Sequence, residues 1–361
     1  MRVGFDARAL VSPAAGVRRY TRELFGAMAA SGDVEVVAAG TAAGADLPAG
    51  VSSAAARATL PTNVGWMFTG LPRAARAAKV DVFHAPSYTA PFGGPRPLVL
   101  TIHDISYERH PEWYPYRRDP ARRAFYRWSA GTADRIITDS EFSKREIVAG
   151  YGLDPGRIAV VPLAAGSVFA PGRNSAPSFS PYLLHVGDLH PRRNLVVAVR
   201  AMRRVRARRP DLRGVRLVLA GVDRGSGAAL IGNASPEEAR LIELAGTVSE
   251  EVLLQLYRGA RGLLYPSLYE GFGLPLLEAM ACGTPVIASR ASSIPEVTGE
   301  AAVLLDPNDD AGWADAIESL FDPAVAGHLQ AAGMRRAAAF TWPRTAAATV
   351  DVYRQALGRS A

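Results

Sequence analysis

Cysteine, lysine and long apolar runs are scarce in this chain of 361 residues. Cys282 is the only cysteine, which excludes an internal disulfide and a cysteine-based metal site, and its apolar neighbours favour a place in the core. No apolar run approaches the roughly 20 residues that a membrane-spanning helix needs. Lys79 and Lys144 are the only lysines, so the formal charge of +7 rests on arginine. Together with the abundant alanine, this indicates a base bias of the genome more than a nucleic-acid partner.

Signals for export and for two common cofactors are also missing. The apolar part of residues 1–11 is interrupted by Arg2, Asp6 and Arg8, which predicts a first strand rather than a signal peptide. We therefore expect a cytoplasmic protein, with the inner face of the membrane as the alternative location. The first strand is not followed by G-x-G-x-x-G, and both lysines lie in the first half of the chain. Neither a dinucleotide nor pyridoxal phosphate is expected, and no cofactor is predicted.

The length and the order of the apolar segments predict an α/β protein with two domains. A hydrophobic content of 48% with 21% charged residues is typical of a globular chain, and the length suffices for two cores. Short apolar runs alternate with amphipathic helical patterns, which is the order of doubly wound parallel sheets. Residues 162–181 are rich in Pro, Gly, Ser and Asn and indicate a linker. We expect one domain over residues 1–170 and a second over 171–341.

One stretch of the second half, residues 262–289, combines two predicted strands with a loop and a helix. The apolar runs 262–266 and 285–288 predict buried strands. Pro275 suits the first turn of the helix between them, and Gly283 suits its C-terminal end. The loop therefore lies where the first strand passes into the helix.

This loop and helix have the residues of a nucleotide-sugar pocket. Glycines let a backbone approach a ligand closely, and the N-terminus of a helix offers N–H groups to a phosphate. Glu270 in the loop and Glu278 on the helix can accept hydrogen bonds from the hydroxyl groups of a sugar and a ribose. Because it lies in a loop, we expect Glu270 to contribute little to the core. The backbone predicted to contact the donor comprises Gly271, Phe272, Gly273 and Leu274.

The segment YEGFGLPLLEAMACGTPVIAS, with its two glutamates, resembles the signature of the retaining glycosyltransferases of family 4, which have the two-domain GT-B fold. The motif blocks are most similar to those of bacterial mannosyltransferases of that family. The resemblance implies two facing Rossmann-like domains, the first for the acceptor and the second for the donor. It also implies that the final helix, residues 342–361, crosses back onto the first domain. An ordinary strand-loop-helix is the alternative, but it does not explain the spacing of Glu270 and Glu278.

Two arginines follow the next predicted strand, residues 182–186, in a loop that in this family binds the diphosphate of the donor. The resemblance gives that role to Arg192 and to Arg193, which replaces the usual lysine. Two solvated arginines are the alternative, disfavoured because cations at a helix N-terminus oppose the helix dipole. By the same resemblance Gly187 contributes to the donor site, and Val248 contacts the nucleobase through its backbone.

In the first half, two segments are candidates for sugar and acceptor contacts. GVRRYTREL resembles the family's glycine-rich loop and helix, but Arg18 stands where a second glycine is expected, so Gly16 and Arg18 are either acceptor contacts or the start of a helix. His103 and Asp104 follow an apolar strand, at the edge where parallel sheets bind ligands. The resemblance places His103 beside the donor sugar, and Asp104 is predicted to contact the acceptor. His84 ends a strand without a second signal, and we expect it to be structural.

Residues 107–135 are rich in arginine and aromatic side chains. Ala121, Ala124, Phe125 and Trp128 share one predicted helical face, and the arginines lie on others. A contact with a membrane surface or a lipid-linked acceptor is one interpretation, and a helix with a solvated arginine face is the other.

The resemblance thus implies a retaining hexosyltransferase that takes a hexose from a nucleotide-sugar, with GDP-mannose favoured, and passes it to a glycan, lipid-linked or small-molecule acceptor. A UDP- or dTDP-sugar as donor and a non-catalytic nucleotide-sugar-binding protein are the alternatives. The predicted catalytic residues are His103, Arg192, Arg193 and Glu270. No metal ligand is predicted, since the chain lacks the Asp-x-Asp motif with which other glycosyltransferases bind a metal.

Overall fold

The computed structural model describes residues 1–40, 46–54, 66–114, 119–172 and 181–358. The chain divides into two compact units, here called unit 1 (Met1–Ala164 with Phe340–Ala361) and unit 2 (Ala165–Ala339). Part of the predicted linker, residues 173–180, lies outside the described residues. In the described part of the chain no helix combines the length and the apolar character that crossing a bilayer requires.

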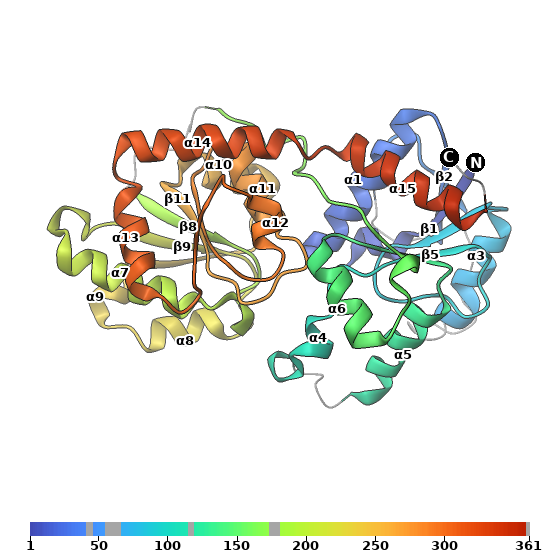
Figure 1. Cartoon of the computed structure of the whole chain (residues 1–361), viewed down its shortest axis with the longest axis horizontal. Coiled ribbons are helices and arrows are strands. Elements are labelled where there is room, and N and C mark those ends of the chain that lie inside the picture. The colour runs from blue at the N-terminus through green and yellow to red at the C-terminus, as the bar shows by residue number, and fades with distance from the viewer. Residues whose placement is uncertain (41–45, 55–65, 115–118, 173–180, 359–361) are drawn as a thin grey trace. The chain divides into compact units, whose positions relative to one another are not determined.

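Unit 1 is built on a parallel sheet with the strand order β3-β2-β1-β4-β5-β6-β7 (Figure 1). β1 pairs with β2 on one side and with β4 on the other, so the winding direction reverses beside β1. This reversal is the switch point at which doubly wound sheets bind ligands. The strands are β1 (Arg2–Asp6), β2 (Glu35–Ala39), β3 (Ser52–Ala54), β4 (Val82–Ala85), β5 (Leu98–Thr101), β6 (Arg135–Thr138) and β7 (Ile158–Val160).

Helices cover both faces of this sheet because its strands alternate buried side chains between the two faces. Phe83 of β4 belongs to a core that includes α3, α5 and α6, whereas His84, the next residue, contacts α1 and α15. The helices of unit 1 are η1 (Ala7–Val11), α1 (Ala15–Ser31), η2 (Trp66–Gly70), α3 (Leu71–Ala77), α4 (Ser106–Arg109), η3 (Pro111–Trp113), α5 (Pro120–Thr132), α6 (Glu141–Tyr151), η4 (Pro155–Arg157) and α15 (Trp342–Ala356).

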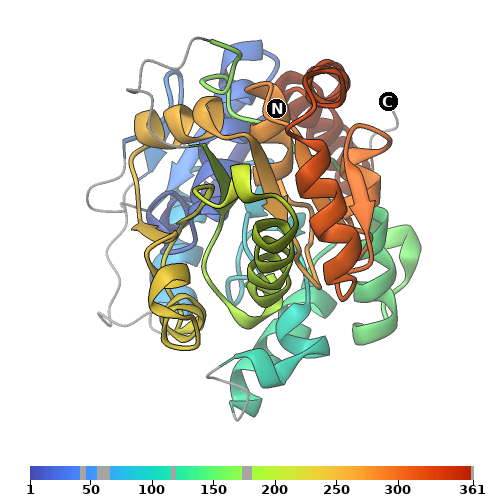
Figure 2. The ribbon, with the colours of Figure 1, turned by 90° about the vertical axis from the view of Figure 1, so that its left-hand side faces the viewer.

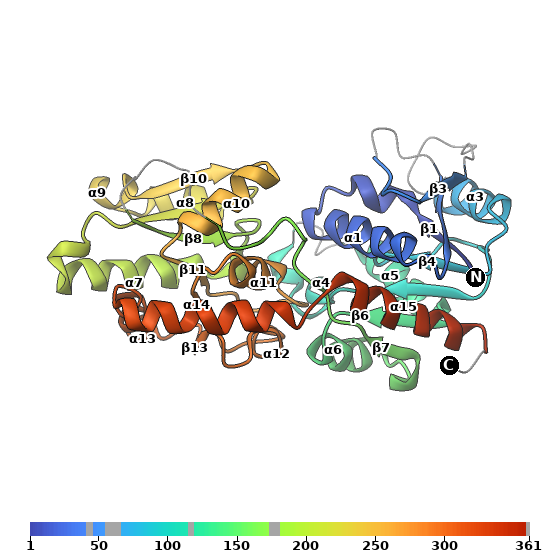
Figure 3. The same ribbon diagram turned by 90° about the horizontal axis from the view of Figure 1, so that it is seen from above.

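The helix α15 belongs to unit 1 although it follows all of unit 2 in the chain, which confirms the expected return of the final helix. It packs along α1 (Figure 3). Its Tyr353 hydroxyl is hydrogen-bonded to Nδ1 of His84 at 2.6 Å, and Nε2 of His84 is bonded to Thr101 Oγ1 at 2.7 Å. Burial lowers the pKa of His84 to about 3, so the ring is neutral. The expectation that His84 is structural is therefore confirmed.

The predicted face of the helix α5 is wrong in part. Ala121 and Ala124 are exposed, whereas Ser129 and Ala130 at the end of the helix are buried. Phe125 is only half-buried, and Trp128 is 37% exposed, so the buried residues of the helix lie in its last turn.

The arginines of α5 do not form a simple solvated face either. Arg123 and Arg127 both make ion pairs with Glu108, a carboxylate that is 8% exposed. The two arginines therefore compensate a buried charge within unit 1, a role that neither interpretation of this segment foresaw.

Unit 2 repeats the architecture with the strand order β10-β9-β8-β11-β12-β13, again parallel, and its winding reverses between β8 and β11. The strands are β8 (Tyr182–Val186), β9 (Arg216–Ala220), β10 (Ile242–Gly246), β11 (Gly262–Tyr265), β12 (Val286–Ser289) and β13 (Val303–Leu305). Its helices are η5 (Pro191–Arg193), α7 (Leu195–Arg208), η6 (Pro210–Leu212), α8 (Ser226–Gly232), α9 (Pro236–Ala239), α10 (Glu250–Gly259), α11 (Leu274–Ala281), α12 (Ile294–Thr298), α13 (Asp310–Ser319) and α14 (Pro323–Ala338).

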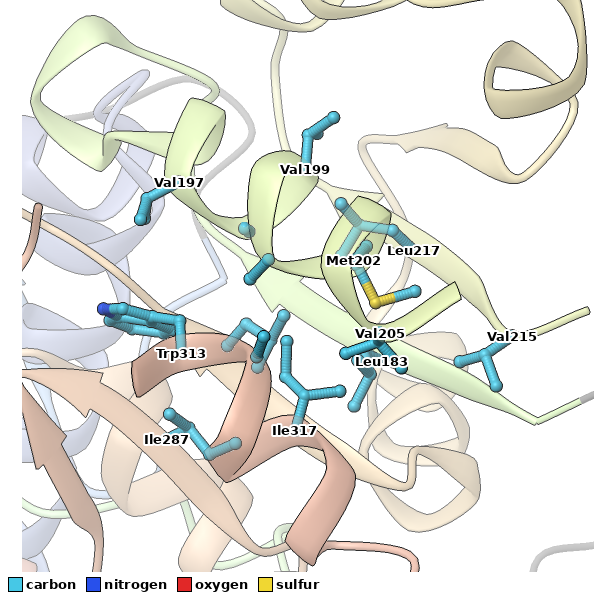
Figure 4. Close-up of a cluster of buried hydrophobic side chains, with 14 of the residues drawn as sticks. Leu183, Val197, Val199, Met202, Val205, Val215, Leu217, Ile287, Trp313 and Ile317 are labelled. Atoms are coloured by element: carbon cyan, nitrogen blue, oxygen red, sulfur yellow. The ribbon is translucent and has the colours of Figure 1, made fainter. Parts of the chain in front are cut away.

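The main core of unit 2 lies between its sheet and the helices α7 and α13. Met202 and Val205 of α7 meet Trp313 and Ile317 of α13 over Leu183 of β8 (Figure 4). In Figure 2, α7 lies between α13 and α8, while α11 packs against α14. Residue Cys282, which ends α11, is buried and free, as expected of a core cysteine.

Candidate functional site

The loops after β8 and β11 meet at the switch point of unit 2. Gly187, the first residue after β8, has φ = 133°. A Cβ atom on it would lie 3.0 Å from Nη2 of Arg193, so glycine leaves room for the guanidinium. The two loops are also tied by their backbones, because the Leu268 N–H donates to the carbonyl of Arg192 at 2.8 Å. Residues predicted separately from two loops are thus brought together.

Arg193 is a buried cation, only 7% exposed, that forms an ion pair with Glu270. Its Nη1 donates to the hydroxyl of Tyr265 at 2.7 Å and reaches Ser267 Oγ at 3.4 Å. Burial lowers the pKa of Arg193, which means that its charge depends on anionic and polar neighbours. The alternative of a solvated arginine is wrong for Arg193, whereas Arg192 is half-buried.

Glu270 is buried, with 4% of its surface exposed, and the expectation that it contributes little to the core is wrong. Its N–H donates to Ser292 Oγ at 2.9 Å. Ser293 Oγ donates to the carbonyls of Glu270 and Phe272, each at 3.0 Å. The two serines belong to the segment after β12, and their hydrogen bonds fix the position of the Glu270 loop. Neither serine was among the predicted site residues. Their position in the segment that follows β12 was the available signal.

The other predicted donor residues take no part in this ion pair. Glu278, 2% exposed on α11, accepts a hydrogen bond from the Tyr257 hydroxyl at 2.8 Å. Gly273 has φ = 105° and precedes α11, where the loop turns into the helix, and Gly271 and Leu274 flank it. Val248 is half-buried just before Ser249, whose side chain caps α10 by accepting from the Val252 N–H at 3.3 Å.

At the switch point of unit 1 lies a cavity of about 680 Å³, here called the aromatic cavity. Its walls come largely from the segments after β1 and β4 and from α5. The ion pair of Asp6 and Arg8 and the side chain of Arg122 provide its charges. Its lining includes Asp6, Arg8, Val11, Pro13, Val17, Met67, Phe68, Tyr88, Phe92, Arg122, Phe125 and Tyr126.

Two apolar side chains that line the aromatic cavity are largely exposed to solvent. Phe68 is 50% exposed and Val11 is 43% exposed. Phe68 stacks on Phe92 with ring centroids 3.7 Å apart, and Phe92 stacks on Trp128 at 4.2 Å. A flat aromatic face of this kind suits the apolar side of a sugar ring or another apolar group.

His103, beside this cavity, is hydrogen-bonded to Asp139, an acidic residue that was not among the predicted site residues. Its Nδ1 lies 2.8 Å from Oδ2 of Asp139. Its ring meets Tyr20 edge-on at 4.7 Å and Tyr88, which lines the cavity, at 5.9 Å. Asp139 directly follows β6, just as His103 comes after β5, so its position at a strand end was the signal available in the sequence.

The three residues predicted to contact the acceptor are not among the described residues that line the aromatic cavity. Gly16 is the second residue of α1 and is helical. Arg18 Nη1 donates to the carbonyl of Ser12 at 2.5 Å. Asp104 Oδ1 accepts from the N–H of Ser106 at 2.9 Å and from its hydroxyl at 2.7 Å, a turn-stabilising arrangement.

Among the residues that the structure describes, no group of three or more His, Cys, Asp or Glu side chains is placed to share a metal ion. Each switch point holds an ion pair of arginine with a carboxylate, Arg8 with Asp6 in unit 1 and Arg193 with Glu270 in unit 2. An arrangement with buried arginine beside glycine-rich backbone can bind phosphate groups, and one with carboxylates can bind hydroxyl groups.

Known proteins resemble this chain over most of its length. Residues 14–164 match the family described as Glycosyltransferase Family 4, and residues 180–322 match the family described as Glycosyl transferases group 1. An O-antigen chain mannosyltransferase B of Escherichia coli is 34% identical over 78% of this chain and 76% of that protein. A D-inositol 3-phosphate glycosyltransferase of Acidothermus cellulolyticus is 32% identical over 72% of this chain and 62% of that protein. Among solved structures, sucrose-phosphate synthase from Thermosynechococcus elongatus has the same fold, with a TM-score of 0.76 at 22% identity over 98% of both chains.

Proposed function

Because the chain belongs to glycosyltransferase family 4 and is a glycosyltransferase with the GT-B fold, we propose that it transfers mannose from GDP-mannose to a glycan acceptor, with retention of the anomeric configuration. The similarity to an O-antigen chain mannosyltransferase supports mannose and a glycan. The observation that carries the proposal is the buried pair of Arg193 and Glu270 at the switch point of unit 2.

The pair supplies a carboxylate for the sugar and a cation for the diphosphate of a nucleotide-sugar. In this proposal Glu270 accepts hydrogen bonds from hydroxyl groups of the sugar, and Arg193 binds the diphosphate together with Arg192. The diphosphate then replaces Glu270 as the anion that compensates Arg193, so the buried cation stays paired after the donor binds. Glu278 binds the ribose hydroxyl groups, and the backbone of Gly271 to Leu274 contacts sugar and phosphate.

The proposed reaction exchanges one bond at the anomeric carbon. The bond from C1 to the diphosphate oxygen breaks, and the bond from C1 to the acceptor oxygen forms on the same face of the sugar. The leaving phosphate oxygen takes the proton of the acceptor hydroxyl, and GDP is released. Negative charge grows on the phosphate as the first bond breaks, and the hydrogen bonds of Arg192 and Arg193 become stronger at that moment. The proposal includes no metal ion.

For the acceptor we propose the aromatic cavity of unit 1. Its stacked Phe68 and Phe92 offer an apolar face to a sugar ring, while Arg8 and Arg122 lie at its wall. A small phosphorylated polyol, of the kind that the second relative's name gives for its substrate, is the alternative acceptor.

A thermal-shift panel with GDP, UDP and dTDP tests the donor first. A ligand at about 100 times its Kd stabilises the folded protein by about 2.7 kcal/mol, which is a clear rise of the melting temperature. We expect GDP to give this rise, and Arg193→Ala to abolish it. Arg203→Ala, which removes an exposed arginine of α7, is the control and should keep the response.

Transfer is then measured with GDP-mannose and mannose-containing glycans. A rise of the melting temperature with UDP or dTDP but not with GDP would mean that the donor is a UDP- or dTDP-sugar. Retention is tested by the anomeric configuration of the product. Binding of GDP without any transfer or hydrolysis of GDP-mannose would refute the proposed activity.

A further inference from the structure

A buried acidic side chain that the mechanism above does not use lies against His103. β5 and β6 are neighbours in the sheet, with Thr101 opposite Ile137, so the segments after these strands emerge side by side. Asp139 is 2% exposed, and its Oδ2 lies 2.8 Å from Nδ1 of His103, whose side chain is 13% exposed.

The backbone around this pair is held on both sides. Ser140 caps α6 by accepting from the N–H of Ser143 at 3.1 Å. The hydroxyl of Ser143 donates to the carbonyl of His103 at 3.0 Å. The start of α6 thus fixes Asp139 and the His103 backbone relative to each other, so the carboxylate has little freedom to leave the ring.

The far side of each partner is left without a hydrogen bond. Nε2 of His103 and Oδ1 of Asp139 are both buried, and neither makes a hydrogen bond of ordinary geometry to the residues that the structure describes, although the Pro86 carbonyl interacts with the ring closely enough to raise its pKa. Buried polar atoms without partners are rare, and at a strand end beside a cavity they indicate atoms that a ligand satisfies. A hydroxyl group of the substrate can supply the hydrogen-bond partner of Nε2.

The groups around the ring favour a proton on it. Tyr20 of α1, Tyr88 after β4 and Asp104 after β5 face the ring besides Asp139, and His84 of β4 lies beyond. Burial acts to lower the pKa of His103, but the carboxylate of Asp139, aided by Asp104 and the Pro86 carbonyl, outweighs it, and the pKa is raised. When the ring is protonated, both nitrogens carry hydrogen atoms, one toward Asp139 and the other at Nε2.

We propose that Asp139 is the positioning residue of His103: it accepts the Nδ1–H bond, fixes the plane of the ring, and thereby directs Nε2–H toward a hydroxyl group of the sugar substrate. The proposal rests on the proposed function for the substrate, but the pairing itself is a property of unit 1. Asp139 does not touch the sugar and acts through His103 alone.

The first test measures the ring directly by nitrogen NMR of ¹⁵N-histidine protein, with His103→Gln used to assign its signals. We expect Asp139→Asn, which keeps the shape of the side chain, to lower the titration midpoint of His103 and to leave the melting temperature near that of the wild type. Asp154→Asn, which changes an exposed carboxylate that caps η4 in the same unit, is the control and should leave the midpoint unchanged. An unchanged His103 midpoint in Asp139→Asn overturns the pairing.

The second test compares rates of transfer, or of donor hydrolysis, across pH. Because the active ring is protonated, we expect the rate to fall as pH rises through the pKa of His103. In Asp139→Asn this fall should occur at lower pH, and kcat should drop by about tenfold or more with little change of the donor KM.

The double variant decides whether Asp139 acts through His103. His103→Ala combined with Asp139→Asn should be no slower than His103→Ala alone, because without the ring there is nothing left to position. A further loss in the double variant shows an independent role of Asp139 and overturns the proposal. If the wild type neither transfers nor hydrolyses any nucleotide-sugar, the proposed function fails, and the NMR titration still decides the pairing.

Discussion

Arg193 and Glu270 form a buried ion pair between the loops that follow β8 and β11. Neither charge could stay in this place alone, because a buried ion without a partner is strongly unfavourable. The pair therefore links the stability of unit 2 to the same two residues that we propose for donor binding.

A mutant cycle should show this link. Arg193→Ala and Glu270→Ala each leave one buried charge unpaired, and we expect each to lower the free energy of unfolding by about 3–5 kcal/mol. The double variant should lose less than the sum of the two single losses. Urea unfolding measures all three free energies. Arg203→Ala, which breaks the exposed pair with Glu238, is the control and should cost about 1 kcal/mol or less.

Additive losses in that cycle would mean that the two side chains do not interact. Glu270→Gln gives a second comparison, since it keeps the volume and removes only the charge.

Arg192 should show its effect in catalysis rather than in stability, because it is half-buried and has no part in the Arg193–Glu270 ion pair. If it stabilises charge on the leaving phosphate, Arg192→Ala should lower kcat and kcat/KM together, by about 10²-fold or more. Arg193→Lys should be milder, because it keeps the cation. Steady-state kinetics at saturating acceptor measure both. A higher donor KM at unchanged kcat in Arg192→Ala would show that the arginine only holds the ground-state diphosphate.

The proposed reaction should not depend on a divalent metal. We expect transfer to continue at an unchanged rate after dialysis against EDTA, because cationic arginines take the place of a metal at the diphosphate. The initial rate is measured before and after dialysis, and again with Mg²⁺ or Mn²⁺ added. A rate that EDTA abolishes and Mn²⁺ restores would require a metal in the mechanism.

Stability should fall in acid because of two buried histidines. Burial lowers the pKa of His84 and of His185 to about 3, well below the 6.5 of an exposed histidine. Between these values the unfolded chain binds protons that the folded chain does not, so stability rises with pH from about 3 to about 6.5 and is fully present above that range. Urea unfolding at several pH values should show a shallower slope for His84→Gln. His328→Gln, an exposed histidine of α14, should keep the wild-type slope.

Phe68 should matter for the acceptor and not for the fold. It is half-exposed, so Phe68→Ala should leave the melting temperature nearly unchanged. Loss of its apolar face should raise the acceptor KM by about tenfold, because burying one aromatic ring against the acceptor contributes about 1.5 kcal/mol or more to binding. Val252→Ala, which shortens an exposed apolar side chain of α10, is the control. An unchanged acceptor KM in Phe68→Ala would place the acceptor elsewhere.

The regular parts of the fold could be predicted because local patterns determine them. The apolar runs became strands within one or two residues of the expected ends, because β11 and β12 lie almost where the runs 262–266 and 285–288 placed them. The loop motifs also led to Arg193 and Glu270. Their contact with each other could not be predicted, because it depends on which strands become neighbours in the sheet.

Single side chains with distant partners escaped the sequence analysis for the same reason. Asp139 stands between a strand and a helix with no repeated pattern, and only its contact with His103 distinguishes it from other strand-end polar residues. Glu108 lies in an arginine-rich segment, and only the folded structure shows that it forms ion pairs with Arg123 and Arg127. The aromatic cavity combines segments from β1, β4 and α5, so no single stretch of sequence contained it.

The position of α15 in the chain determines when unit 1 can fold during synthesis. Tyr353 completes the hydrogen bonds of His84, and the Thr345 hydroxyl donates to the Pro162 carbonyl at 2.8 Å, so unit 1 depends on residues that the ribosome makes after all of unit 2. The half of the protein that emerges first can therefore finish folding only after the other half has left the exit tunnel. Until then the apolar face of α1 that α15 covers stays exposed to solvent, and exposed apolar surface of this kind makes a folding intermediate prone to aggregation.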